Sequence, residues 1–304
     1  MNVLLFLIFV FIIVMVLIVI LLVFLHLRKT VMQRNFGDYT LLGIIGRGGM
    51  ATIYRAKNRV LNLPVAVKIL DQALMGDRDL VYKFLKEGEN LERINTEFPD
   101  SPVVKTLEYS HPKSDGPYFI VMDYLRGSNL LQITKTRPIP DLKTKLYIIK
   151  EVARALQNSH SLKIFHRDIA PDNIILNGNT VTLIDFGIAK QEFSDYRTMD
   201  GAIAGKPYYM SPEQCSASEI NEKTDIYSLG AVLYYLVEGK PLYESKNPIE
   251  IMKMHQKKPV PEIEEDIPED LKSFIYIMLA KKPEARPSAQ EVLSKMQFFM
   301  EQGV

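Results

Sequence analysis

The chain has 304 residues, of which 47% are hydrophobic, so it can fold one large domain or two small ones. Its formal charge is +1 and it has no block of like charges, so nothing in the composition indicates a nucleic-acid partner. The single cysteine, Cys215, excludes an internal disulfide framework and is typical of a protein in a reducing compartment. We expect it to be an ordinary thiol rather than a catalytic one.

The first element in chain order is an unbroken apolar run over residues 3–25. A helix of this length, at ~1.5 Å per residue, reaches ~34 Å, which is enough to cross a bilayer. A cleaved signal peptide is the alternative, but its basic start, shorter apolar core and small-residue cleavage site are missing. Arg28, Lys29 and Arg34 follow the run. The positive-inside rule therefore predicts a single-pass anchor in the cell membrane, with the N-terminus outside and everything after the run in the cytoplasm.

Only two residues precede the apolar run, so we expect any external sensing or activation to come from a partner protein. Residues 26–38 form a mostly polar juxtamembrane linker. Strand-like runs separated by Gly-rich and Asn/Pro turns fill residues 39–68. A helix is predicted over 78–94, and a buried strand over 117–125.

A different period begins near residue 141. Apolar residues spaced by three and four predict one buried face of a helix, made by Leu142, Leu146, Ile149, Ala153, Leu156 and His160. We expect His160 to be a hydrogen-bonded core histidine rather than a ligand. Short strands over 173–176 and 181–184, a polar loop to about 212 and then mostly helix complete the chain. Strands first and helices second predict an α+β fold with two lobes and a cleft between them.

Two features of the first half are candidates for phosphate binding. The stretch "IGRGGMATIY" (45–54) places three glycines in four positions between two predicted strands, which lets backbone N–H groups approach a phosphate. Taken alone, such a stretch is more often a glycine-rich hairpin turn. Lys68 ends the apolar strand "VAVK", where a lysine is costly unless it meets an anion, and Glu87 on the predicted helix is a candidate partner. Two unrelated surface residues are the alternative.

The second half supplies the more specific pattern. His166-Arg167-Asp168 is followed by Asn173, and Asp185 begins "DFG" at the end of a predicted strand. Phosphoryl transfer requires an acid that takes the proton of a hydroxyl group. It also requires groups that hold metal ions, here an amide and a second acid. The stretches "SPE" (211–213), "DIYSLG" (225–230) and "ARPS" (285–288) follow in order.

Together these motifs resemble the eukaryotic-like (Hanks-type) protein kinase family over residues 39–299. The stretches "GRGGMATIY" and "YMSPEQ" are most similar to the bacterial serine/threonine branch. The resemblance implies an α+β, bilobal fold with a small antiparallel β-sheet lobe over about 39–122 and a larger helical lobe over about 126–299. It implies ATP and Mg²⁺ (or Mn²⁺) between the lobes, and protein substrates that are phosphorylated on serine or threonine.

The resemblance also assigns roles to single residues. Asp168 would orient the substrate hydroxyl and accept its proton, Glu87 would fix Lys68, and Met122 would stand as gatekeeper beside the adenine. Metal ions would be held by Asn173 and Asp185. Glu213 would pair with Arg286, and Asp225 would hold the loop around Asp168, both as structural contacts. The implied ATP site consists of Ile45, Gly46, Arg47, Gly48, Gly49, Met50, Ala51, Thr52, Ile53, Lys68, Asp123 and Leu125.

Three positions depart from the family pattern. Ala51 replaces the third glycine, which is a mild change. Gly88 follows the expected glutamate, costs ~1 kcal/mol of helix propensity and could make the Lys68–Glu87 pair conditional. Ala170 stands where serine/threonine kinases usually carry a lysine, while Lys206 stands where they usually carry a threonine. Our hypothesis is an exchange in which Lys206 supplies the missing charge at the active site. The alternative is a surface lysine beside a decayed site.

Regulation and competing functions are also indicated by the sequence. Arg167 is typical of kinases that bind a phosphate on the activation segment, where Thr198 or Ser194, rather than Tyr196, is the expected autophosphorylation site. A nucleotide-binding pseudokinase or scaffold, a small-molecule phosphotransferase and a tyrosine-directed kinase remain as alternatives. The presence of Lys68, Glu87, Asp168, Asn173 and Asp185 argues against the first. The stretches "SPE" and "DIYSLG" argue against the second, and Pro171 with "YMSPEQ" argues against the third.

Overall fold

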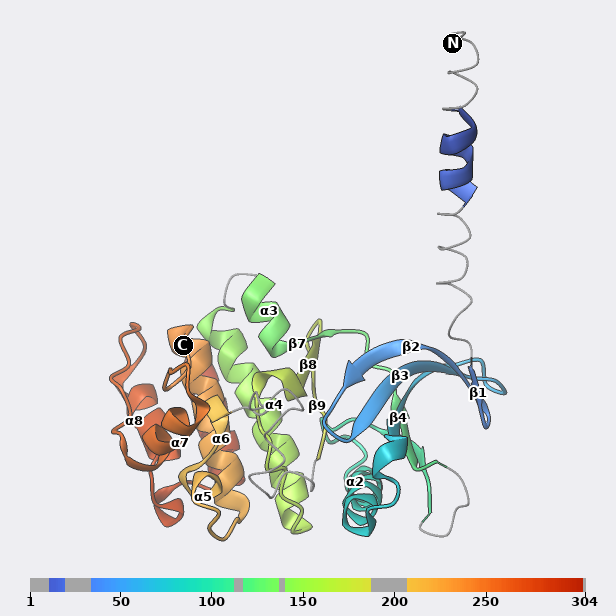
Figure 1. Cartoon of the computed structure of the whole chain (residues 1–304). Helices are drawn as coiled ribbons and strands as arrows, with labels where there is room; N and C mark the ends of the chain where they lie inside the picture. The colour runs from blue at the N-terminus through green and yellow to red at the C-terminus, as the bar shows by residue number, and fades with distance from the viewer. Residues whose placement is uncertain (1–10, 20–33, 112–116, 137–139, 187–206, 303–304) are drawn as a thin grey trace.

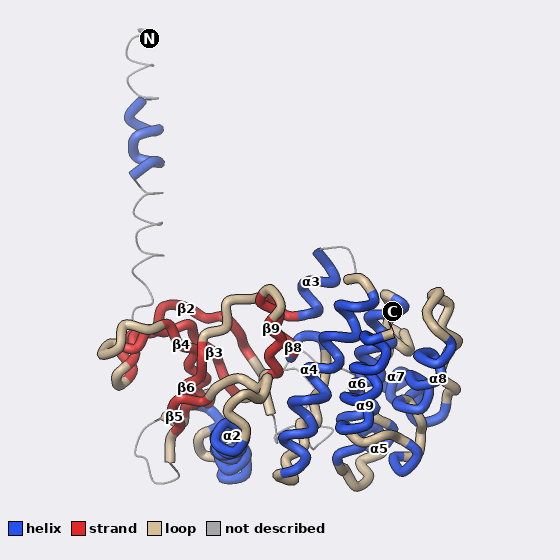
Figure 2. The backbone as a smooth tube through the Cα atoms, turned by 180° about the vertical axis from the view of Figure 1, so that it is seen from behind, coloured by secondary structure: helices blue, strands red, loops and turns tan. Residues whose placement is uncertain are grey.

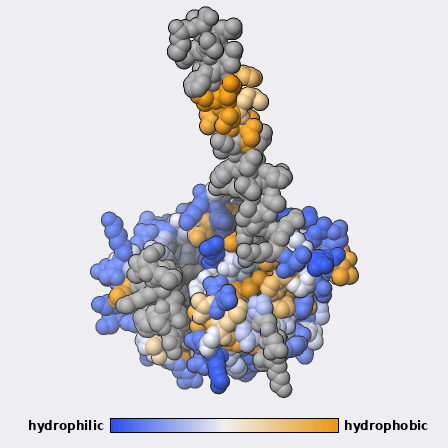
Figure 3. Space-filling view, turned by 45° about the vertical axis from the view of Figure 1, so that its right-hand side comes forward, coloured by the Kyte–Doolittle hydropathy of each residue, from blue (hydrophilic) through white to orange (hydrophobic). Residues whose placement is uncertain are grey.

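A computed structural model describes residues 11–19, 34–111, 117–136, 140–186 and 207–302. Residues 11–19 form a helix whose side chains are all exposed, and Figure 3 shows it as an apolar surface that contrasts with the mostly hydrophilic body. Within the described ranges, no helix has the length and apolar character needed to cross a membrane. The predicted span over 3–25 extends beyond the described helix on both sides.

The first lobe is a six-stranded antiparallel sheet with one long helix against it (Figure 1). The sheet order is β1-β2-β3-β4-β6-β5. Its strands are β1 (Arg34–Phe36), β2 (Tyr39–Arg47), β3 (Ala51–Asn58), β4 (Pro64–Leu70), β5 (Thr106–Tyr109) and β6 (Phe119–Asp123). The strand-like runs predicted over 39–68 are therefore confirmed as three consecutive strands, of which β3 pairs with both β2 and β4.

Helix α2 (Arg78–Glu97) covers one face of this sheet. It begins at Asp77, whose carboxylate accepts the N–H groups of Asp79 and Leu80 and so caps the helix. The helix predicted over 78–94 is confirmed and continues for one further turn. Its buried face carries apolar side chains together with Glu87 and Gly88.

The second lobe is helical, as Figure 2 shows, and carries a short three-stranded sheet. Its elements are β7 (Ser128–Asn129), α3 (Leu130–Thr136), α4 (Leu142–Ser161), β8 (Ile174–Asn177), β9 (Thr180–Leu183), α5 (Pro212–Cys215), α6 (Glu222–Glu238), α7 (Pro248–Lys257), α8 (Glu269–Met278) and α9 (Ala289–Glu301). Short 3-10 turns occur at Gln72–Leu74, Pro171–Asn173, Pro207–Tyr209 and Pro283–Ala285.

The predicted apolar face of α4 is confirmed, because Leu146, Ile149, Ala153 and Leu156 are fully buried. Helix α6 is buried on nearly all sides, which is typical of a central core helix. One continuous core includes buried residues of both lobes. The lobes are also joined through the backbone, since Val104 N–H donates to the carbonyl of Leu183 at 3.0 Å. The predicted α+β, bilobal fold is confirmed, and its active-site elements meet at this junction.

Candidate active site where the two lobes meet

Lys68 is the cation at the centre of the candidate site. It lies on β4 and is 8% exposed, and its Nζ is 2.5 Å from Glu87 Oε1 on α2 and 3.0 Å from Asp185 Oδ1 just beyond β9. Burial alone would lower the pKa of Lys68, but the charges of Asp185 and Glu87 outweigh it and hold this pKa above its ordinary value. Lys68 is therefore a charged ammonium group held between two carboxylates, one from each lobe.

Asp225 of α6 holds the loop that carries Asp168. It is fully buried, and its two oxygens accept the backbone N–H groups of His166 at 2.9 Å and Arg167 at 2.7 Å. His160 Nε2 lies 2.8 Å from Asp225 Oδ2. Burial by itself would raise the pKa of Asp225, but the hydrogen bond and charge of His160 and the interactions with His166 lower it below its ordinary value. An ionised carboxylate thus fixes the loop backbone, as expected for this residue.

Asp168 is oriented by its own loop. The amide Nδ2 of Asn173 donates to Asp168 Oδ2 at 2.9 Å and to the Asp168 carbonyl at 2.8 Å. His166, which is fully buried, contacts the ring of Phe186 with 4.7 Å between centroids, and its Nε2 lies 2.9 Å from the carbonyl of Ile184. These contacts join the loop of Asp168 to the segment that carries Asp185.

Two residues of this region have backbone angles that L-amino acids rarely adopt. Arg167 has φ = 66° and Asp185 has φ = 60°. Such conformations cost ~1–3 kcal/mol each and persist where the surrounding structure enforces them, often at active sites. In this chain the enforcing contacts are the Asp225 carboxylate for Arg167 and the Lys68 ammonium for Asp185.

The oxygen atoms present fit a magnesium site that substrate phosphates would complete. Because Asn173 uses its amide N–H groups on Asp168, its Oδ1 is available as a metal ligand, and Asp185 supplies a carboxylate. Among the described residues, no three His, Cys, Asp or Glu side chains are grouped so that they could hold a metal ion. Mg²⁺ commonly takes one or two protein oxygen ligands and completes its shell with phosphates and water. Asn173 and Asp185 match that requirement.

The turn between β2 and β3 fits a phosphate. Gly48 N–H donates to the carbonyl of Ala51 at 2.9 Å, which closes the turn. A Cβ added to Gly49 would meet no atom within 4 Å, and one added to Gly48 would meet only the Ala51 oxygen at 3.6 Å. The internal packing of the protein therefore does not require glycine at position 49. Close approach of the backbone to an anion would require it.

The segment after β6 is where the adenine was predicted to bind. Met122 is buried at the end of this strand, and Asp123 N–H donates to the carbonyl of Lys105 at 2.9 Å. The N–H of Asp123 is therefore already used within the protein. Leu125 lies just beyond the strand and packs against the main core.

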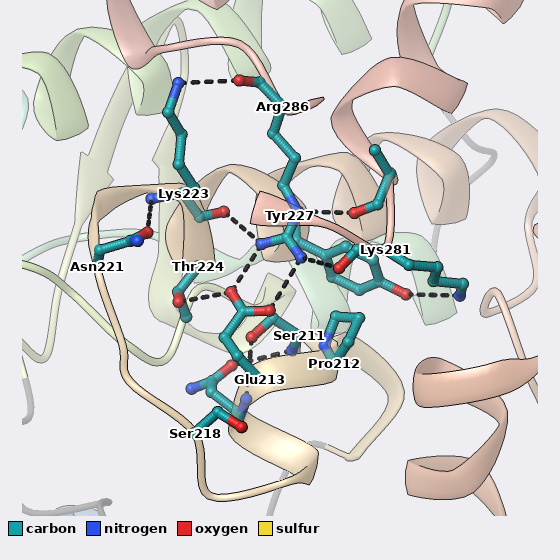
Figure 4. A network of polar contacts seen from close by, with 12 residues as sticks. Ser211, Pro212, Glu213, Ser218, Asn221, Lys223, Thr224, Tyr227, Lys281 and Arg286 are labelled. Carbon is teal, nitrogen blue, oxygen red and sulfur yellow. Dashed lines mark hydrogen bonds and ion pairs between the residues drawn. The ribbon is translucent and has the colours of Figure 1, made fainter. Parts of the chain in front are cut away.

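Glu213 and Arg286 form the structural ion pair that the resemblance implies (Figure 4). Arg286 Nη1 and Nη2 donate to the two Glu213 oxygens at 2.7 and 2.9 Å. The remaining guanidinium N–H groups donate to the carbonyls of Ala280, Lys223 and Lys281. All five donors of the arginine are thus used. Burial would raise the pKa of Glu213, but the hydrogen bond and charge of Arg286 lower it.

Several predicted residues lie outside the described part of the chain. Lys206 and the candidate phosphorylation sites Ser194, Tyr196 and Thr198 fall within residues 187–206, so the proposed exchange is not placed by the structure. Its other member, Ala170, is fully buried.

Other contacts were missed by the sequence analysis. His160 was expected to be a bonded core histidine, but its partner Asp225 could not be named, because 65 residues separate them. Gln214, beside "SPE", donates to the carbonyl of Arg167 at 2.7 Å and so ties the start of α5 to the loop of Asp168. No local sequence signal marks this contact.

Comparisons with known proteins agree with this geometry. The family model described as "Protein kinase domain" matches residues 39–299. A probable serine/threonine-protein kinase of Clostridium perfringens is 33% identical over 264 residues, covering 85% of this chain and 38% of that protein. The serine/threonine-protein kinase PrkC of Bacillus subtilis is 32% identical over 257 residues, covering 83% of this chain and 38% of that protein. The chain thus spans about two fifths of the length of these curated relatives.

Solved structures are similar in fold. The kinase domain of PknI from Mycobacterium tuberculosis superposes with a TM-score of 0.67 at 23% identity, covering 90% of this chain and 99% of that domain. A likeness at this identity concerns the fold alone. The family model covers most of the chain. The chain therefore belongs to the protein kinase domain family.

Proposed function

We propose that this chain is an active kinase that transfers the γ-phosphate of ATP to serine or threonine hydroxyls of proteins. The observation that carries the proposal is the contact of the buried Lys68 ammonium with the buried Glu87 and the partly exposed Asp185, which brings residues of both lobes within 3.0 Å. A scaffold that does no chemistry has no physical need for a charged lysine held at this cost of burial. The names of the curated relatives support serine and threonine as the acceptors.

In this proposal the residues of the chain divide the work. Lys68 binds the α- and β-phosphates and is kept extended by Glu87. Asp168, oriented by Asn173, accepts the proton of the substrate hydroxyl as its oxygen attacks. When bound, ATP with a divalent cation supplies the phosphoryl group and screens its charge. Asn173 and Asp185 would hold the cation.

Phosphotransfer from labelled ATP tests this function directly. The full chain in detergent, with Mg²⁺ or Mn²⁺ and a generic protein substrate, should yield phosphoserine or phosphothreonine. Asp168→Asn keeps the shape but removes the base, so it should abolish transfer while ATP still binds. Nucleotide binding without any transfer by the wild type would instead identify a pseudokinase. Phosphotyrosine would identify a tyrosine-directed enzyme, and transfer only to a sugar or choline would identify a small-molecule phosphotransferase.

We further propose that Lys206 supplies the positive charge that Ala170 lacks. The support is the sequence, in which a lysine is lost at one position and gained at a neighbouring motif position. Lys206→Ala should lower kcat by ~10²-fold or more, as loss of an electrostatic stabiliser of the transition state does. Lys246→Ala, at an exposed lysine of the helical lobe, is the matched control and should leave kcat unchanged. Equal activity of the two variants would refute the exchange.

Autophosphorylation of the activation segment is part of the same proposal. Arg167 Nε is buried and has no hydrogen-bond partner within the described residues. Burial lowers the pKa of Arg167, with the charge of Asp225 acting in the opposite direction. A phosphate would supply the missing acceptor. Mass spectrometry of wild-type and Asp168→Asn protein should find phosphate on Thr198 or Ser194 only in the wild type.

Finally, we propose that residues 3–25 anchor the kinase in the cell membrane with the kinase domain in the cytoplasm, where a sensor or activator protein could act on it. The support is the apolar run and the described helix 11–19, which is apolar on all sides. The full chain should resist alkaline extraction from membranes, whereas a chain lacking 3–25 should be released. If alkaline extraction released the full chain as well as the shortened one, residues 3–25 would not be a membrane anchor.

A further inference from the structure

Tyr109 of β5 packs directly on Gly88 of α2. A Cβ added to Gly88 would lie 2.8 Å from Tyr109 Cγ and 3.0 Å from Tyr109 Cβ and Cδ2. Contacts under 3.0 Å between carbon atoms force one of the two groups to move. The absence of a side chain at position 88 is therefore what lets β5 approach the helix so closely.

A bulge in β5 aims Tyr109 at the helix. Thr106 pairs with Met122 and Tyr109 pairs with Ile120, but the intervening register is shifted, so that β5 holds one residue more than β6 over this stretch. In a regular strand, positions 106 and 109 would face opposite sides of the sheet. Because of the extra residue, Tyr109 lies on the same face as Thr106 and reaches α2.

Two polar contacts join the same two elements, both to residues of α2 that follow Gly88. Tyr109 Oη donates to Glu92 Oε2 at 3.0 Å, one turn after Gly88. Asn95 Oδ1 accepts Thr106 N–H at 2.7 Å. Gly88 and Asn95 are ~10.5 Å apart along a helix, and Thr106 and Tyr109 are ~10 Å apart along a strand. The helix and the strand are therefore matched at two points, which fixes the position of α2 along β5.

Glu87 precedes Gly88 and lies on the same buried face, with its Oε1 2.5 Å from Lys68 Nζ. We propose that Tyr109 is a positioning residue: packed against Gly88, it holds α2 at the position relative to β5 at which Glu87 reaches Lys68. This inference rests on the proposed function, in which Lys68 binds ATP. It also reverses the expectation from the sequence, since Gly88 allows the ion pair to form rather than weakening it.

Gly88→Ala separates the two interpretations by the sign of its effect. If helix propensity alone mattered, alanine would favour α2 and would preserve or improve nucleotide affinity. If the contact positions the helix, the added methyl group pushes α2 off Tyr109 and moves Glu87 away from Lys68. We expect Gly88→Ala to weaken binding of a fluorescent ATP analogue by about tenfold, or ~1.4 kcal/mol, and to raise KM for ATP more than it lowers kcat.

Rescue at position 109 provides the second test. Tyr109→Ala removes Cγ and Cδ2, two of the three atoms nearest to the added methyl group, and keeps Cβ at 3.0 Å. The double variant Gly88→Ala/Tyr109→Ala should therefore bind the analogue about as well as Tyr109→Ala alone. Additive losses would overturn the proposal. If Gly88→Ala alone fails to fold, the comparison of the double variant with Tyr109→Ala still decides.

Gly230→Ala is the matched control. It lies in helix α6, and its added Cβ would meet Met278 Cβ at 2.9 Å, a clash of the same size in the other lobe. It should lower Tm while leaving affinity for the analogue at the wild-type level. An equal loss of affinity in both glycine variants would show a general packing effect and refute the positioning role. Because these experiments measure nucleotide binding, the positioning role of Tyr109 is tested even if the wild type transfers no phosphate. Unchanged binding by Gly88→Ala would overturn the positioning role and leave the proposed kinase function untouched.

Discussion

The buried pair of Glu213 and Arg286 supports a quantitative prediction about stability. Arg286 is 2% exposed, and each of its five N–H groups donates to a protein oxygen. Arg286→Met leaves the Glu213 carboxylate buried, with Thr224 Oγ1 as a remaining donor at 2.7 Å. Loss of one partner of a buried ion pair costs ~3–5 kcal/mol, a large part of the ~5–15 kcal/mol of a typical domain.

Two further variants separate the net contribution of the ion pair to stability from the destabilisation caused by one unpaired charge. Glu213→Gln removes the opposite charge and should be similarly destabilising, because the guanidinium is then buried without an anion. The double variant Glu213→Gln/Arg286→Met contains neither charge, so it should be more stable than the sum of the single losses predicts, by ~1–3 kcal/mol.

Urea unfolding at pH 7.5, followed by circular dichroism, measures these effects. In Arg286→Met the pKa of Glu213 should rise above its ordinary value, because the cation that lowers it is gone. When its pKa is raised in the folded state, Glu213 binds a proton more readily in the folded than in the unfolded protein. The free energy of unfolding of this variant should therefore recover, relative to wild type, as the pH falls toward 5. A loss below ~1 kcal/mol in Arg286→Met, or strictly additive single losses, would contradict the reasoning.

Two other predictions follow from buried groups of the helical lobe. Asp225→Asn leaves one side-chain oxygen where the wild type has two that accept backbone N–H groups of the Asp168 loop. We expect kcat to fall by ~10²-fold while the affinity for ATP at Lys68 is retained. A loss of ATP affinity without a fall in kcat would argue against a role of Asp225 in holding this loop. Burial, with the charge of Lys281, lowers the pKa of His255 to about 3. The stability that neutral His255 contributes is complete above its unfolded pKa of ~6.5 and is lost as the pH falls toward 3. Wild type should therefore be ~1.4 kcal/mol less stable at pH 5.5 than at pH 7.5, and His255→Asn should remove most of that difference; an unchanged difference would assign it to other groups.

Sequence motifs predicted the members of the active site but not the contacts among them. Lys68, Glu87 and Asp185 were each singled out, and a pair between the first two was expected. The second contact of Lys68, to Asp185, joins residues 117 positions apart, so no local pattern carries it. His160 shows the same limit, because its apolar spacing predicted burial while its partner depends on how α4 packs against α6.

Gly88 shows what a propensity rule leaves out at one position. Considered as part of an isolated helix, glycine is a weak point. In the folded protein, β5 lies so close that a methyl group does not fit, and the bulge that brings Tyr109 there depends on the pairing of β5 with β6. Helix propensity describes one element, whereas this position is decided by contact between two.

Hydrogen-bond capacity distinguishes two of the buried cations in the described part of the chain, Arg286 and Lys68. Arg286 has five N–H donors and five acceptors, so it offers nothing to a ligand, and its role is to hold α5 to the segment before α9. Lys68 has three N–H donors, of which Glu87 and Asp185 take two, and the side chain of Asp185 is 33% exposed. A cation with one N–H donor that no described residue takes, beside a partly exposed carboxylate, can bind an anion without losing its existing partners. We therefore expect the phosphates to bind beside the Lys68 ammonium.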